Sequence, residues 1–189
     1  MGKFERLKTK FDDIIIIRPT VFKDERGFFL ETYNKQEFAE IGIHDEFVQD
    51  NISHSAKGVV RGLHYQAKNA QGKLVRVLQG KILDVMVDIR NGSLTYGQHI
   101  SIELTAEDPV MVYVPIGFAH GFMALEDDTE VMYKVTDFYS PQYDAGIRWN
   151  DPDLSIPWPI MAYGIIRPVV SSKDAVLPFL KDIISPFDY

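Results

Sequence analysis

Two apolar, β-branched segments follow each other in the stretch Leu74-Val75-Arg76-Val77-Leu78-Gln79-Gly80-Lys81-Ile82-Leu83-Asp84-Val85-Met86-Val87-Asp88-Ile89. Gly80 lies in the polar turn between them, which predicts a short hairpin turn joining two strands. From Leu83 to Ile89 every second residue is a large aliphatic one, the period of two that is typical of a strand. Asp84 and Asp88 occupy alternate positions, where a solvated face is equally compatible with the pattern.

The sequence on both sides repeats this pattern of short apolar runs punctuated by Gly, Pro and Asn. Many short strands at regular spacing predict an all-β sandwich or barrel. A chain of 189 residues suits one domain over residues 1–189, and a double-sheet jelly roll is the natural architecture at this length. Further strands are expected at 14–17, 28–33, 47–53, 100–104, 110–114 and 131–139.

Helical signals are confined to two places. Asn34 and Glu37 form a capping-box pattern that predicts a short helix ending at Gly42. A second short helix is expected near 177–184. Between them, the prolines of 149–159 exclude a central strand or a helix, so this segment is expected to wrap the barrel in extended form.

Composition narrows the functional classes. The net charge of -7 provides no electrostatic footprint for a nucleic acid or an anionic membrane, so neither is expected as a partner. No apolar run approaches the roughly 20 residues of a membrane span, and residues 1–6 lack the apolar core of a signal peptide. The absence of cysteine excludes disulfides and thiolate metal sites. We therefore expect a cytoplasmic protein.

Three cationic or titratable side chains lie within thirteen residues: Arg61, His64 and Lys73. Histidine is the default proton-transfer group, and a lysine can stabilise negative charge on a substrate oxygen. A lone histidine in a strand is more often structural, so the function depends on its partners. A carboxylate would orient it, and Asp174, Asp84, Asp88 and Asp50 all remain candidates. Tyr133 and Tyr139 share parity on one expected strand, so either could be a proton donor or a core aromatic residue.

A metal site is not predicted. Histidine-bound metals in jelly rolls use two histidines one residue apart, and here Gln66 stands where the second would follow His64. His120 could act only as a distant third ligand. Arg61 and His64 have opposite parity and would point to opposite faces of a regular strand, unless Gly62 marks a bulge that re-aims one of them.

Ten motifs in one order resemble those of the dTDP-4-dehydrorhamnose 3,5-epimerase family, over about residues 14–174. Each motif alone is weak, but ten in register are highly specific. They are Asp24-Glu25-Arg26-Gly27-Phe28-Phe29, Phe47-Val48-Gln49-Asp50-Asn51, Arg61-Gly62-Leu63-His64, Gln71-Gly72-Lys73-Leu74-Val75-Arg76, Asp84-Val85-Met86-Val87-Asp88-Ile89-Arg90, Pro115-Ile116-Gly117-Phe118-Ala119-His120-Gly121-Phe122, Tyr133-Lys134, Tyr139-Ser140-Pro141, Trp149-Asn150-Asp151-Pro152 and Ser172-Lys173-Asp174.

The resemblance implies a metal-independent, cofactor-free, cupin-type jelly roll that forms a homodimer. It implies epimerisation of dTDP-4-dehydro-6-deoxy-D-glucose at C3 and C5, giving dTDP-4-dehydro-L-rhamnose for polysaccharide biosynthesis. His64 corresponds to the base, Asp174 to its carboxylate partner, Lys73 to the group holding the C4 oxygen, and Tyr133 to the acid on the opposite face. The substrate-contacting positions would be Arg26, Glu31, Gln49, Asp50, Asn51, Arg61, His120, Tyr139, Asp144 and Lys173.

Two details of the resemblance bear on the site. Asp144 stands where a relative has glutamate, which would alter a contact but not the chemistry. Arg26 and Glu31 precede the barrel, so an arm of the partner subunit is expected to deliver them. Three other functions remain open: a mono-epimerase or ketoisomerase acting on a related nucleotide sugar, a non-catalytic nucleotide-sugar binding module, and a metal-dependent cupin oxygenase. The presence of Tyr133 favours double epimerisation.

Overall fold

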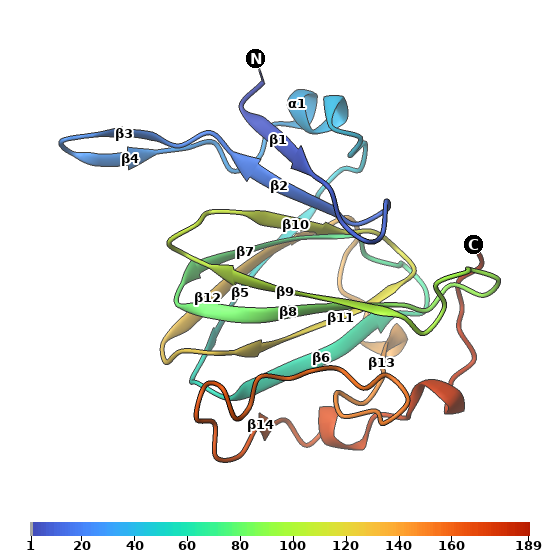
Figure 1. Ribbon diagram of the computed structural model, residues 1–189. Helices are drawn as coiled ribbons and strands as arrows, with labels where there is room; N and C mark the ends of the chain where they lie inside the picture. Colours follow the sequence, from blue (N-terminus) through green and yellow to red (C-terminus); the bar gives the residue numbers. More distant parts are fainter. Residues whose placement is uncertain (1) are drawn as a thin grey trace.

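The computed structural model describes residues 2–189, and it consists mostly of two facing β-sheets (Figure 1). The first sheet has the order β1 (Phe4–Leu7), β2 (Ile15–Pro19), β10 (Met111–Val114), β7 (Lys73–Gln79), β12 (Thr129–Val135), β5 (Gln49–Ser55). The second has the order β13 (Asp144–Gly146), β6 (Val59–Gln66), β11 (Phe118–Ala124), β8 (Lys81–Asp88), β9 (His99–Thr105), with the short β14 (Val169–Val170) beside β6. The predicted double-sheet jelly roll is confirmed.

The inner faces of the sheets form the central core. Val75 and Val131 from the first sheet pack with Met86, Phe118 and Phe122 from the second, and all five are buried. Burial of each such side chain stabilises the fold by about 1.5–3 kcal/mol, which favours the arrangement of two closed layers over separate hairpins. Polar residues on these inner faces are therefore held inside the protein.

The turn at Gly80 does not form a hairpin, contrary to the sequence prediction. β7 pairs with β10 and β12, whereas β8 pairs with β9 and β11, so the chain crosses from one sheet to the other at this turn. Gly80 has φ +73°, and an added Cβ would lie 2.5 Å from the Thr129 hydroxyl. A tight turn with a left-handed residue is compatible with either connection, so local sequence does not distinguish them.

β8 is buried on both faces. The possibility that Asp84 and Asp88 lie on a solvated face, which the sequence left open, is therefore wrong. Its Leu83–Ile89 aliphatic set packs under the C-terminal segment, together with residues such as Leu154 and Leu180. The intervening Asp84 and Asp88 are 0% exposed. The alternation identifies two faces correctly, but it does not show that the tail covers the apolar one.

The elements outside the sheets differ in part from the predictions. Helix α1 (Lys35–Glu40) forms as expected, and the Asn34 side chain accepts hydrogen bonds from two backbone N–H groups of its first turn. The helix expected near 177–184 is only a 3₁₀ turn, η3 (Leu180–Asp182), because Pro178 interrupts the segment. The short 3₁₀ helices η1 (Pro141–Tyr143) and η2 (Asp174–Val176) complete the tail half.

Two strands are also shorter than predicted. The strand expected over 28–33 ends early, and β3 (Phe22–Asp24) and β4 (Gly27–Phe29) form a separate two-stranded hairpin. This hairpin, called the arm below, projects away from both sheets (Figure 1). The strand expected over 131–139 ends at Val135. In the part of the chain that the model describes, no helix has the length and apolarity to cross a membrane.

Candidate active site

A pocket of about 450 Å³ opens between the two sheets. His64 on β6 and His120 on β11 line it from the second sheet, and Lys73 on β7 and Tyr133 on β12 line it from the first. Asp174 reaches it from the tail. The pocket thus gathers residues that lie more than one hundred positions apart in the sequence.

A bulge in β6 allows Arg61 and His64 to face the same pocket. On β11, His120 pairs with His64 and Phe122 pairs with Arg61, so β6 has one more residue than its neighbour in this interval. Gly62 lies inside the bulge with φ +122°, and an added Cβ would lie 2.5 Å from the Gly121 Cα. The sequence left open whether Gly62 marks a bulge, and the structure shows that it does, which resolves the parity conflict.

His64 and Asp174 form a hydrogen-bonded pair at the pocket wall. His64 Nε2 lies 2.7 Å from Asp174 Oδ1, and the backbone N–H of Gly62 donates to Asp174 Oδ2 at 3.1 Å. Burial raises the pKa of Asp174, but the bonds and charge of His64, the Gly62 N–H and Lys173 outweigh it and lower the pKa overall. An ionised carboxylate only accepts hydrogen bonds, so Nε2 carries the proton and Nδ1 is the free ring nitrogen.

Lys73 and Tyr133 supply the polar groups of the facing sheet. The Lys73 ammonium donates to the His64 carbonyl at 3.2 Å. Burial lowers the Lys73 pKa to about 8, against the raising effect of Asp84 and Asp144. Burial also raises the pKa of the Tyr133 phenol, which the charge of Arg61 opposes only in part. At neutral pH the pocket therefore holds an ammonium and a protonated phenol.

A second polar cluster lies beside the pocket. Asp144 accepts a hydrogen bond from the Tyr139 hydroxyl at 3.0 Å and forms an ion pair with Lys173. Burial lowers the pKa of Lys173, but Asp144 raises it by more. This cluster is linked to the His64–Asp174 pair in two ways. Lys173 is the residue before Asp174, and Asp144 lies on β13, which pairs with the strand β6 that carries His64.

Comparisons with known proteins identify the family of the chain. The model of the dTDP-4-dehydrorhamnose 3,5-epimerase family matches residues 8–182. The chain belongs to this family. The resemblance found in the sequence motifs is thereby confirmed, and relatives of the family supply a direct measure of how closely the chain follows it.

Two family members and one solved structure illustrate the similarity. The dTDP-4-dehydrorhamnose 3,5-epimerase of Methanothermobacter thermautotrophicus is 49% identical over 174 residues, covering 92% of this chain and 93% of the relative. That of Pseudomonas aeruginosa is 50% identical over 163 residues, covering 86% and 88%. The crystal structure of dTDP-6-deoxy-D-glucose-3,5-epimerase from Legionella pneumophila, in complex with dTDP-4-keto-L-rhamnose, has a TM-score of 0.94 at 43% identity and covers 98% of each chain.

Most of the positions inferred from the epimerase family lie at or near the pocket. Arg61 lines it and donates to the Ser55 hydroxyl at 3.1 Å. Gln49 and Asn51 occupy the same face of β5, with Asn51 opposite Tyr133, and the Gln49 amide donates to Asn51 at 2.8 Å. The backbone N–H of Tyr139 donates to Gln49 at 3.1 Å, which joins this strand to the Asp144 cluster.

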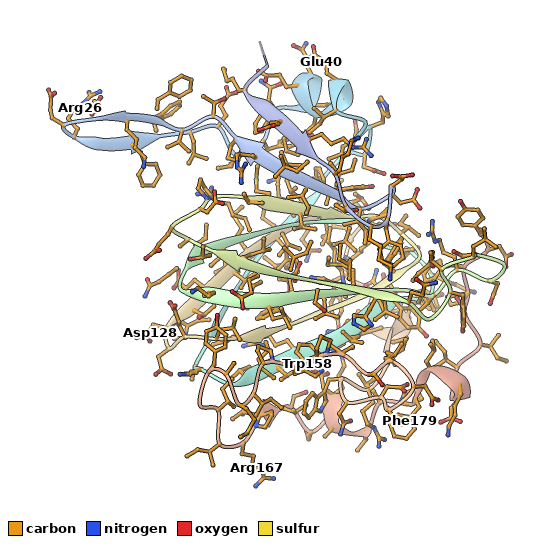
Figure 2. The ribbon with its side chains drawn as sticks, viewed as in Figure 1. Arg26, Glu40, Asp128, Trp158, Arg167 and Phe179 are labelled. Carbon is orange, nitrogen blue, oxygen red and sulfur yellow. The ribbon has the colours of Figure 1, made fainter. Side chains whose placement is uncertain are left out.

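Of the ten inferred substrate-contacting positions, three line the pocket, namely Arg61, His120 and Lys173, and three others make contacts elsewhere in the chain. Asp50 points to the opposite face of β5 from Asn51, where it accepts from Lys134 at 2.7 Å. Arg26 lies at the tip of the arm (Figure 2) and pairs with Asp24. Glu31, beyond the arm, pairs with Lys3 at 2.9 Å. Within a single subunit, these three residues therefore contact other side chains and not the pocket.

Two further side chains clarify the site. Gln66, the residue that replaces a second histidine ligand, is 4% exposed and accepts from the Ser140 N–H at 2.7 Å, so it anchors a loop. Among residues 2–189, no group of three or more His, Asp or Glu side chains could hold a metal ion. Asp84, considered from sequence only as a partner of His64, instead binds His120, with 2.6 Å between Oδ1 and Nε2. An acidic residue within an aliphatic strand was the available signal for this contact.

Proposed function

We propose that this protein catalyses epimerisation of dTDP-4-dehydro-6-deoxy-D-glucose at C3 and C5, giving dTDP-4-dehydro-L-rhamnose, in dTDP-L-rhamnose biosynthesis. The observation that carries the proposal is the meeting of a His–Asp pair, a partly buried ammonium and a protonated phenol in one pocket. The Legionella pneumophila structure, similar over 98% of both chains, is a complex with dTDP-4-keto-L-rhamnose, and this supports a keto-sugar ligand for the present protein.

The first step is proton abstraction beside a ketone. C3 and C5 both flank the C4 carbonyl, so loss of either proton places negative charge on the same oxygen. His64 takes the proton at Nδ1, the nitrogen that its bond to Asp174 leaves free. Lys73 stabilises the enolate oxygen as an ammonium, and in a partly buried site such a charge acts more strongly than in bulk solvent. One lysine thus serves both carbons.

Inversion needs a proton from the opposite face of the sugar ring. Tyr133 belongs to the first sheet and His64 to the second, so the two groups reach the pocket from different layers of the fold. The raised pKa of Tyr133 keeps its phenol protonated and able to donate. Protonation by Tyr133 after abstraction by His64 inverts the carbon, and a change of ring pucker presents the second carbon to the same pair.

Binding of the nucleotide requires cations that overcome the overall charge of -7. Arg61 and Lys173 line the pocket and suit the diphosphate. Gln49, Asn51 and Tyr139 form an adjoining polar surface for the rest of the ligand. His120 faces the pocket from β11 and completes the set of groups around the sugar.

The arm supports a homodimer as the active form. Its Phe28 and Phe29 side chains are 67% and 68% exposed, an unusual state for aromatic residues on a projecting hairpin. In the proposed dimer the arm of one subunit lies against the other subunit's pocket, which brings Arg26 and Glu31 to the substrate. This arrangement accounts for the contacts that both residues make within their own chain, outside its pocket.

Proton NMR in D₂O with EDTA-treated enzyme tests the proposed reaction. Incubation with dTDP-4-dehydro-6-deoxy-D-glucose should remove the signals of both the C3 and the C5 protons and produce the L-configured ketone. Exchange at one carbon alone would identify a mono-epimerase instead. Binding without exchange at either carbon would contradict the proposed activity and favour a nucleotide-sugar binding module.

A further inference from the structure

Asp84 is a buried carboxylate with only one of its two oxygens satisfied. It is 0% exposed, and its Oδ1 lies 2.6 Å from His120 Nε2. Its Oδ2 is also buried and accepts no hydrogen bond from the residues that the structure describes. An ionised oxygen removed from water without a partner is costly, so a compensating positive charge is required nearby.

Lys73 supplies that charge from the facing sheet. Both Lys73 and His120 line the pocket, and Asp84 lies on the inner face of β8, opposite Phe122 and hydrogen-bonded diagonally to His120 on β11. Of the carboxylates that act on the Lys73 ammonium, Asp84 has the largest effect, ahead of Asp144. The same carboxylate therefore acts on two pocket groups, one by a hydrogen bond and one through space.

We propose that Asp84 is a positioning residue for the oxyanion subsite, fixing the His120 ring and holding Lys73 as an ammonium so that both converge on the C4 oxygen. This inference rests on the proposed function and extends it to a residue outside the reacting groups. Because an ionised carboxylate only accepts, His120 donates through Nε2 and turns its other ring nitrogen away from Asp84. Asp84 itself touches no substrate atom.

The other charged and titratable groups around Lys73 belong to several elements, and they define the background against which Asp84 acts. They are His64 and Arg61 on β6, His120 on β11, Tyr133 on β12, Asp144 on β13, and Lys173 and Asp174 in the tail. Of all these groups and Asp84 itself, only Asp84 and Asp144 raise the pKa of Lys73. Asp144 is already bonded to Lys173 and Tyr139, which leaves Asp84 as the principal counter-charge.

The test is the pH dependence of kcat for Asp84→Asn, which keeps the side-chain volume and removes the charge. We expect the alkaline limb of the profile to move to lower pH by about one unit, and kcat at pH 8 to fall about fivefold, with KM changed less than about threefold. Asp108→Asn is the matched control, because it removes a carboxylate from an exposed pair with Arg18. It should leave the profile in place. An Asp84→Asn profile that is lowered equally at every pH would show a structural role only and overturn the proposal.

Two additions keep the test decisive. If Asp84→Asn does not fold, the double variant Asp84→Asn/Lys73→Met should fold, because it also removes the unpaired ammonium; a double variant that stays unfolded overturns the proposal. NMR titration of protein carrying ¹³C-labelled lysine measures the Lys73 pKa without substrate, and it should fall by about one unit in Asp84→Asn. An unchanged Lys73 pKa refutes the inference even if the wild type epimerises, whereas an inactive wild type with a shifted Lys73 pKa refutes only the proposed function.

Discussion

Asp174→Asn is the substitution that discriminates most sharply between an oriented base and a merely structural histidine. Asp174 is 4% exposed and accepts two hydrogen bonds, from His64 Nε2 through Oδ1 and from the Gly62 N–H through Oδ2. Asparagine has one accepting and one donating end. If its oxygen stays on Gly62, its amide faces Nε2 and forces the His64 proton onto Nδ1. If its oxygen faces Nε2, its amide opposes the Gly62 N–H.

The size of the effect follows from these contacts. A hydrogen bond between charged groups contributes about 1.5–3 kcal/mol, and each 1.4 kcal/mol is a factor of ten, so loss of the His64–Asp174 bond reduces kcat about 10- to 150-fold. The Asp174 side chain is only 5% exposed, so solvent screens this interaction little. The unfavourable tautomer adds to the loss, and we expect about a 10²–10³-fold decrease in kcat.

The assay is steady-state turnover at neutral pH together with deuterium incorporation at C3 and C5. His64→Ala sets the floor, because it removes the base completely. The matched control is Asp151→Asn, since Asp151 is 2% exposed and accepts from the backbone N–H groups of Asp153 and Leu180 in the tail, away from the pocket. It should lower thermal stability while kcat stays within about twofold. Folded Asp174→Asn with more than a tenth of wild-type kcat would refute the assignment of the base.

Three further predictions concern other parts of the site. Tyr133→Phe should reduce formation of the inverted product by about 10²-fold or more, while deuterium wash-in continues, since His64 still removes the proton; equal loss of both would contradict its role as acid. Lys73 acts as an ammonium and its pKa is lowered to about 8, so kcat should fall as pH rises through about 8, and a flat profile from pH 7 to 10 would exclude it as the oxyanion group. A mixture of inactive Arg26→Ala and inactive His64→Ala subunits should recover about a quarter of wild-type activity, because half of the dimers pair an intact arm with an intact pocket at one site of two; no recovery would contradict the exchange of arms.

The strands could be predicted from sequence because each carries its own apolar pattern. The bulge at Gly62 was one of two alternatives, because Arg61 and His64 have opposite parity and the sequence does not show whether both face the pocket. The pairing of β7 with β8 was wrong, since a tight glycine turn is compatible with strands in one sheet or in two. The terminal helix was wrong because Pro178 limits the segment to a short 3₁₀ turn.

The partners within the site depend on sheet pairing, and pattern alone leaves them open. Four carboxylates were equally possible beside His64, and the structure brings Asp174 to it across 110 positions. Asp84 lies closer in sequence, but its strand β8 pairs with β11, where Asp84 binds His120 instead. Sequence-based prediction is limited in the same way for the arm. The sequence shows that Arg26 precedes the barrel, but it does not show that the hairpin carrying Arg26 projects away from the sheets.

The double-sheet fold suits a reaction that needs a base and an acid on opposite sides of the sugar ring. Packed sheets lie about 10 Å apart, a spacing that admits one sugar ring between groups on the two inner faces. His64 and its carboxylate belong to one side, while Lys73 and Tyr133 belong to the other. The chain crosses between the sheets at Gly80, so Lys73 on β7 and Asp84 on β8 lie in facing sheets. The turn that resembles a hairpin in the sequence thereby allows the Asp84 carboxylate to act on the Lys73 ammonium from the opposite sheet. In this fold the connection between strands, more than any single loop, determines which chemistry the pocket can perform.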